Sequence, residues 1–178
     1  MRVIAGELKG RRLESLKGEN TRPTLDRVKE SMFNILQNSI CGSCVLDLFC
    51  GSGALGIEAL SRGAGAAYFF DSQRDALEIA KTNIERCGLK DRCFVFNYDH
   101  IQALRYIESK GIQFDLIFLD PPFENQFIED CVKKCLNLLS QHGIITIEHN
   151  INNRFGENLF NIIGQKRYGK IGLTFIKK

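Results

Sequence analysis

The chain has 178 residues, 44% of them hydrophobic and 25% charged, which is ordinary for a globular protein with one main domain. No apolar run approaches the ~18 residues of a membrane-spanning helix, and the first residues lack the apolar core of a signal peptide. We therefore expect a cytoplasmic protein without a membrane partner. The net charge is +3, but residues 1–44 and 151–178 are basic while the residues between them are acidic. Basic ends suit a polyanionic partner, although ordinary solvated surface explains them equally well.

The first 20 residues are predicted to form a small basic hairpin that extends the main domain, residues 21–178. Val3-Ile4 and Arg12-Leu13 flank its glycine-containing turn. A helix follows Pro23, with Thr24 as its N-cap. The predicted apolar face of this helix consists of Leu25, Val28, Met32, Ile35 and Leu36.

From Cys44 onward, predicted strands alternate with predicted helices. The strands lie at residues 44–49, 67–70, 93–96, 114–119 and 143–148, and β-prone runs follow near 159–163 and 171–176. The helices lie near residues 54–62, 73–87, 100–109 and 125–139. This order is typical of an α/β fold with a parallel sheet and helices on both faces. Ligands bind at the carboxyl ends of the strands in such sheets, so the functional residues should follow them.

The seven cysteines are expected to be reduced thiols that pack as small hydrophobic side chains. Their number is odd and several lie in apolar runs, unlike a disulfide framework. Cys41-x-x-Cys44 could supply half of a zinc site, but Cys131-x-x-x-Cys135 matches the apolar face of a helix instead of a second ligand pair. No metal is therefore expected.

The first chemical motif is the glycine loop after the strand that ends near Phe49. Gly51-x-Gly53-x-x-Gly56 fits the dinucleotide fingerprint, so NAD is one candidate ligand. Asp47, just ahead of the turn, would repel a pyrophosphate and attract the ammonium group of a methionine moiety. The chain is also short for a second, substrate-binding domain. The loop, with Asp47, Phe49, Gly51, Ser52 and Gly53, is therefore predicted to hold S-adenosylmethionine.

Acidic residues also follow the next two predicted strands. Asp71, with Ser72 beside it, comes 24 residues after Asp47 and suits a ribose diol, in NAD and in S-adenosylmethionine alike. Asp99 could accept a hydrogen bond from the adenine amino group, or it could simply be the N-cap of the following helix.

The fourth predicted strand ends in Asp120-Pro121-Pro122-Phe123. Asp120 and Pro121 each precede a proline, which favours extended backbone, and neither proline has an N–H group. The segment thus presents a carboxylate and a carbonyl, both acceptors, beside an aromatic ring. This suits an amino group on a flat base: its two N–H groups bind Asp120 and the Pro121 carbonyl, and Phe123 stacks on the base. A histidine base is not expected, because the amino proton becomes acidic only after methylation.

Together these motifs resemble class I S-adenosylmethionine methyltransferases that act on amino nitrogens, and more narrowly the RsmD-type 16S ribosomal RNA guanine-N2 methyltransferases of bacteria. Residues 6–13, 22–30 and 51–62 carry the narrower resemblance, which extends from residue 2 to about 175. Cys50 departs from it, since the family often has alanine there. The resemblance implies a Rossmann-like, seven-stranded, mostly parallel sheet with an antiparallel last strand. It also implies a monomer that methylates a guanine N2 in 16S rRNA, within a small-subunit particle.

Two alternatives stay open. One is a DNA methyltransferase acting on adenine N6 or cytosine N4, although no segment is long enough for a target-recognition region. The other is a non-catalytic RNA-binding module that keeps the fold. Whether the chain is an RNA methyltransferase or a non-catalytic RNA-binding module, its basic N-terminal residues are predicted to bind RNA phosphates. These candidates are Lys9, Arg11, Arg12, Arg22 and Arg27.

Overall fold

The computed structural model describes residues 1–15, 23–121, 127–152 and 159–178. Its helices are α1 (Pro23–Leu36), α2 (Ala54–Ser61), α3 (Arg74–Arg86), α4 (His100–Lys110) and α5 (Ile128–Leu138), with short 3₁₀ turns η1 (Gln37–Ser39) and η2 (Lys90–Arg92). Its strands are β1 (Cys44–Asp47), β2 (Ala66–Phe70), β3 (Cys93–Phe96), β4 (Phe114–Leu119), β5 (Leu139–Asn150), β6 (Asn161–Tyr168) and β7 (Ile171–Lys177).

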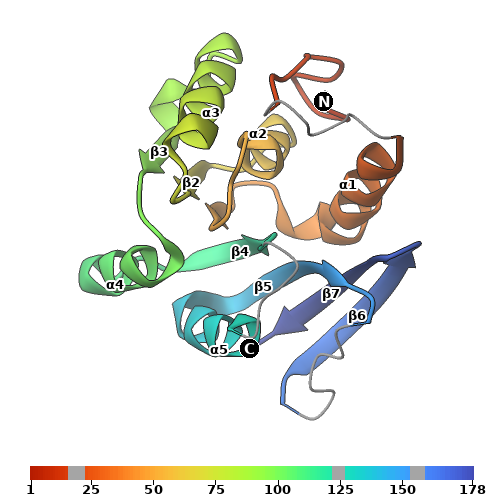
Figure 1. The fold of residues 1–178 in the computed structure, drawn as a ribbon, viewed down its shortest axis with the longest axis vertical. Helices are drawn as coiled ribbons and strands as arrows, with labels where there is room; N and C mark the ends of the chain where they lie inside the picture. Colours follow the sequence, from red (N-terminus) through yellow and green to blue (C-terminus); the bar gives the residue numbers. More distant parts are fainter. Residues whose placement is uncertain (16–22, 122–126, 153–158) are drawn as a thin grey trace.

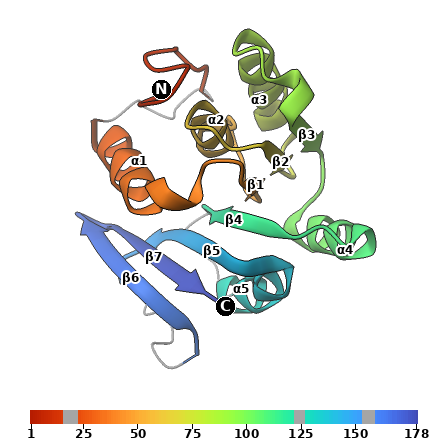
Figure 2. The same ribbon diagram turned by 180° about the vertical axis from the view of Figure 1, so that it is seen from behind.

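The described strands form a seven-stranded sheet in the order β3-β2-β1-β4-β5-β7-β6. The pairs from β3 to β5 are parallel, whereas β7 lies antiparallel to both β5 and β6. In both views α1, α2 and α3 lie on one side of the sheet and α4 and α5 on the other (Figures 1 and 2). The predicted α/β Rossmann-like fold is confirmed. Because the chain runs outward from β1 to β3 and then returns to β4, the strand order reverses between β1 and β4, where such sheets bind ligands.

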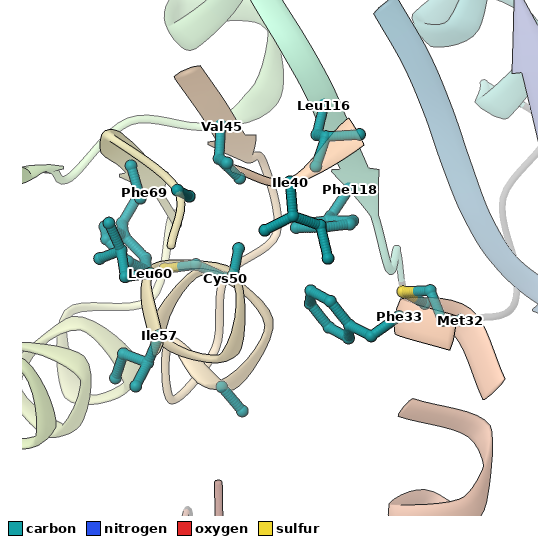
Figure 3. Packing of buried hydrophobic residues seen from close by; sticks show 14 of the residues in the cluster. Met32, Phe33, Ile40, Val45, Cys50, Ile57, Leu60, Phe69, Leu116 and Phe118 are labelled. Atoms are coloured by element: carbon teal, nitrogen blue, oxygen red, sulfur yellow. The ribbon is translucent and has the colours of Figure 1, made fainter. Parts of the chain in front are cut away.

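The hydrophobic core is divided by the sheet. One side packs α1, α2 and α3 on β1 and β4, and there the rings of Phe33 and Phe118 lie 5.5 Å apart (Figure 3). The predicted apolar face of α1 was wrong at Ile35, which is 43% exposed, while Phe33 is fully buried. The buried arc of the helix follows residues 28, 32, 33 and 36, and Ile35 lies outside it.

The last strands are longer than predicted. β5 begins at Leu139, directly after α5, because Leu139 already pairs with Phe114 of β4. β6 continues through Gln165, Lys166 and Arg167, which the apolar pattern did not indicate. It is an edge strand paired only with β7 among the described strands, so its polar side chains remain in water.

The predicted N-terminal hairpin is present as a short antiparallel pairing. Arg2 and Arg12 form a β-bridge, and backbone bonds join Val3 N to Arg11 O and Leu13 N to Met1 O, both at 2.9 Å. The predicted boundary at residue 20 lies outside the described residues. In both views the hairpin lies over α2 (Figures 1 and 2), so it covers the helix that carries the glycine loop.

Glu58 of α2 anchors this hairpin from inside the protein. Its side chain is fully buried, and its two oxygens accept the N–H groups of Ile4 at 2.7 Å and Ala5 at 3.0 Å. The same carboxylate pairs with Lys29 of α1 at 3.2 Å and with Arg62 at 2.8 Å. Burial lowers the pKa of Lys29, and the Glu58 charge opposes that effect. One carboxylate therefore links the hairpin, α1 and α2.

Candidate active site

The glycine loop after β1 is bound to strands on both sides. Leu48 N donates to Phe118 O at 3.2 Å, and Cys50 N donates to Phe70 O at 3.0 Å. Gly51 and Gly53 have φ angles of 50° and 78°, a region that other residues rarely adopt. A Cβ atom on Gly51 would meet no described atom within 4 Å. The loop therefore offers backbone that a ligand can approach closely.

Gly56, the third glycine of the motif, has a packing role. A Cβ atom there would lie 2.3 Å from Cε1 of Phe69, so α2 approaches β2 this closely only because the side chain is missing. Gly56 N also donates to Asp47 Oδ2 at 3.0 Å. Packing therefore accounts for this glycine without a pyrophosphate ligand.

Asp47 is a buried carboxylate at the end of β1, with 2% of its surface exposed. Burial is the main reason that its pKa is raised to about 7; the charges of Asp120 and Asp71 also raise it, while the Gly56 N–H lowers it. No cationic side chain of the described residues forms an ion pair with Asp47. A positively charged ligand group would therefore stabilise its ionised form.

Asp71, after β2, holds the glycine loop in place. Its Oδ2 accepts the N–H of Gly51 and its Oδ1 accepts the N–H of Gln73, both at 2.9 Å. Asn97, which the sequence analysis missed, donates to the carbonyls of Asp71 and Ser72 at 3.0 and 3.1 Å. The sequence feature that could have identified Asn97 is its position directly after β3, where site residues are expected. The partly exposed Asp71 is thus fixed beside the loop.

The other predicted cofactor residues lie in different surroundings. Ser52 is buried, with its hydroxyl 4.0 Å from the Met1 sulfur, whereas Ser72 is exposed. Asp99 caps α4: its Oδ1 accepts Gln102 N at 2.8 Å, and the Gln102 side chain accepts Asp99 N at 3.2 Å. The N-cap interpretation of Asp99 is therefore correct, and its contact with adenine stays a prediction.

Three carboxylates lie at the carboxyl ends of the neighbouring strands β1, β4 and β5. Asp120 is exposed directly after β4, and its charge raises the pKa of Asp47 on one side and of Glu148 on the other. Glu148, near the end of β5, was not identified from the sequence, since only the strand order places it beside Asp120. Pro121 is buried. Pro122 and Phe123 lie outside the described residues.

Aromatic rings join the glycine loop to two helices. The rings of His100 and Phe127 stack with centroids 4.3 Å apart and an interplanar angle of 11°, and Phe49 lies 5.9 Å from the first and 6.3 Å from the second. Burial lowers the pKa of His100, which favours the neutral form of this ring. Phe49, a predicted cofactor residue, is thus supported by the first turn of α4 and by Phe127 just before α5.

Cys50 and His149, two groups that could react near the strand ends, are buried. The seven cysteines are free thiols, and burial raises the pKa of Cys50 well above its usual value, so it is a poor nucleophile. His149 is buried, with ring nitrogens 2.9 Å from Asn150 O and from Thr174 Oγ1. Within the described ranges no group of three or more His, Cys, Asp or Glu side chains could hold a metal. No described helix has the length and apolarity needed to cross a membrane.

Four of the five predicted RNA-binding residues are described, three on the hairpin and one on α1. Lys9, Arg11, Arg12 and Arg27 are all exposed. Arg11 Nη1 donates to Arg86 O at 3.1 Å, which positions that guanidinium against the end of α3. Arg22 lies outside the described residues.

Several known proteins resemble this chain over most of its length. The family model described as conserved hypothetical protein 95 matches residues 1–177. The ribosomal RNA small subunit methyltransferase D of Haemophilus influenzae is 37% identical over 152 residues, which cover 83% of this chain and 78% of that protein. The solved structure of YhhF from Escherichia coli has a TM-score of 0.84 and 29% identity, and covers 100% of this chain and 97% of that one.

A more distant structure, SMU.776 complexed with SAH, has a TM-score of 0.73 at 19% identity and covers 87% of this chain and 49% of that one. It shows the shared fold. The family model and the Haemophilus influenzae relative show more than the fold, because one spans nearly the whole chain and the other exceeds a third identity over most of it. The chain therefore belongs to the conserved hypothetical protein 95 family, the RsmD-type family that its motifs resemble.

Proposed function

We propose that this chain transfers a methyl group from S-adenosylmethionine to the N2 amino group of a guanine in 16S ribosomal RNA. The observation that carries the proposal is the position of Asp120 at the end of β4, one strand from Asp47 and its glycine loop. A ligand at the loop then lies next to an acceptor for an amino group. The name of the Haemophilus influenzae relative supports ribosomal RNA of the small subunit as the substrate.

The residues around the loop fit S-adenosylmethionine. A buried Asp47 with a raised pKa suits the ammonium group of the methionine end. The open backbone at Gly51 admits the middle of the molecule, while Gly53, whose α-carbon faces Ala80 of α3, shapes the turn beneath it. Asp71 suits the ribose hydroxyls. Phe49, Ser52, Ser72 and Asp99 are further predicted contacts. When bound, S-adenosylmethionine supplies an electrophilic methyl group.

Asp120 and Pro121 orient the target amino group. Its two N–H groups donate to the Asp120 carboxylate and the Pro121 carbonyl, which directs the nitrogen lone pair toward the methyl group. Both residues precede a proline, so their extended backbone needs little further ordering. Catalysis then depends on positioning and on preorganised acceptors, with no covalent enzyme intermediate. Pro122 and Phe123 complete the predicted motif, with Phe123 stacked on the base.

Asp71→Ala should weaken S-adenosylmethionine binding more than tenfold, a loss of over about 1.4 kcal/mol. The change removes the acceptor for the ribose and also the acceptor for Gly51 N–H. Isothermal titration calorimetry measures the effect. Asp91→Ala, on the distant η2 turn, is the control and should bind like the parent. If the parent binds NAD as tightly as S-adenosylmethionine, the cofactor assignment is wrong.

RNA docking is proposed at the basic surface of Lys9, Arg11, Arg12, Arg22 and Arg27. A paired or stacked guanine must be flipped out to reach Asp120, which costs a few kcal/mol. Phosphate contacts at the hairpin would offset this cost, and the hairpin lies against α2, which carries the glycine loop.

Replacing Lys9, Arg11 and Arg12 together with glutamine should weaken RNA binding and reduce its salt slope by about 0.7–0.9 per lost contact. Filter binding across a salt series measures this, and cofactor affinity should not change. The matched control replaces Lys110, Lys133 and Lys134, which are exposed on the helices of the opposite sheet face. If both triple variants bind like the parent, docking must be sought at the basic residues 166–178.

Methyl transfer to ribosomal particles tests the proposed function directly. Small-subunit particles from cells that lack the protein should accept a tritiated methyl group, and nucleoside analysis should identify N2-methylguanosine. Label in N6-methyladenine or N4-methylcytosine of DNA would favour the DNA methyltransferase. RNA binding without any transfer would favour the non-catalytic module.

A further inference from the structure

Glu148 lies next to Asp120 across two parallel strands. Leu119 pairs with Ile147, so the residues that follow, Asp120 and Glu148, stand side by side at the carboxyl ends of β4 and β5. Side chains alternate along a strand, and therefore Glu148 extends from the same sheet face as Thr146, beside Phe118. Asp47 pairs with Phe118 and belongs to that face too. The three carboxylates thus share one face and one edge of the sheet.

Within the described residues, no side chain or backbone group is held by the Glu148 carboxylate. Only 9% of its surface is exposed, yet no hydrogen bond or ion pair reaches it from the described part of the chain. Burial raises its pKa to about 8, and the Asp120 charge contributes. Glu58, by contrast, is fully buried and receives two backbone N–H groups and two cations. A buried acid without such donors destabilises the folded protein. Acids of this kind are typical of ligand-binding sites.

We propose that Glu148 accepts the N1–H of the target guanine and thereby selects guanine over adenine and cytosine. This assignment rests on the proposed function. Guanine presents N1–H directly beside its N2 amino group, so two neighbouring donors face two neighbouring carboxylates, Asp120 and Glu148. Adenine and cytosine present an unprotonated ring nitrogen beside their amino groups. An ionised Glu148 facing that nitrogen meets a second acceptor, which leaves both groups without a partner. Because the pKa of Glu148 is raised to about 8, the selection should be strongest above pH 8, where the acid has no proton to donate, and the substrates are compared there.

The base 2-aminopurine keeps the amino group at position 2 but lacks the N1 hydrogen and the 6-oxo group of guanine. The change in preference on substituting Glu148 therefore isolates the part that N1 recognition contributes. The substrates are small-subunit particles reconstituted with 16S RNA whose methylated guanine, located by the nucleoside assay, is either retained or replaced by 2-aminopurine through ligation. We expect the parent enzyme to prefer guanine at least about 100-fold in kcat/KM, as sites built around a substrate N–H do.

Glu148→Gln should reduce this preference to below about tenfold, because the amide can donate to the unprotonated N1. Glu148→Ala should reduce it by slowing guanine alone. The ratio of the two substrates does not depend on the fraction of folded enzyme, so a partly misfolded variant still gives a valid answer. Glu108→Gln, exposed on α4, is the control and should keep the parent ratio.

Equal use of both bases by the parent, or an unchanged ratio in both Glu148 variants, would overturn the proposal while leaving the proposed function intact. Absence of guanine methylation by the parent would refute the proposed function itself, and the role of Glu148 with it.

Discussion

Asp120→Ala should reduce methyl transfer at least about 10²–10³-fold while leaving S-adenosylmethionine affinity nearly unchanged. The loss is of the size expected when one preorganised polar group that stabilises the transition state is removed. Affinity should persist because Asp47, the glycine loop and Asp71 remain in place. Single-turnover transfer of a tritiated methyl group measures the rate, and calorimetry measures the affinity.

The same variant should also lose less stability than the parent as the pH rises through the pKa values of Asp47 and Glu148, as measured by urea unfolding of the ligand-free protein. The Asp120 charge raises the pKa of both Asp47 and Glu148, so its removal lowers both values. An acid whose folded-state pKa is raised loses stabilising free energy as the pH rises from its unfolded pKa through its folded pKa. For Asp47 that window ends at about pH 7 and for Glu148 at about pH 8. An Asp120→Ala enzyme that stays active would contradict the role of Asp120 in methyl transfer. An unchanged pH dependence of unfolding would contradict the effect of its charge on Asp47 and Glu148.

Glu58→Ala should destabilise the protein by about 3–5 kcal/mol, the usual loss when one partner of a buried ion pair is removed. Lys29, only 6% exposed, would keep a buried charge without its carboxylate, and the N–H groups of Ile4 and Ala5 would lose their acceptors. Urea unfolding at pH 7, with a constant m-value, measures the change.

A matched control for Glu58→Ala exists in Glu78→Ala. Glu78 pairs with Lys81 on the surface of α3, with side chains 69% and 53% exposed, so the loss should stay within about 0.5 kcal/mol. Because Glu58 also holds the hairpin, limited proteolysis should cut the Glu58→Ala variant first within its N-terminal residues. A loss below about 1 kcal/mol would mean that water replaces the carboxylate, and that the hairpin is anchored elsewhere.

Several features were predictable from local sequence. The alternation of apolar strands and amphipathic helices identified the elements from β1 to α5, because each must bury one face. The glycine pattern after Asp47 and the proline pair after Asp120 limit backbone geometry within a few residues, so both loops were identified without a structure. Ile35 was misassigned because the apolar residues of α1 do not show which side of the helix packs on the sheet. Phe33, which the pattern left out, packs on Phe118 of β4.

Sequence alone therefore determined the α/β class and the positions of Asp47, Asp71 and Asp120 at or just after the ends of strands, where the site is predicted. Tertiary structure decided which of these ends are neighbours. The strand order places β1, β4 and β5 side by side, although β1 and β5 are about a hundred residues apart in the chain, and only this order brings Glu148 to Asp120. The burial of Glu58 and the packing of Gly56 against Phe69 were decided in the same way, since pairing between distant segments depends on the whole core and leaves no local periodicity.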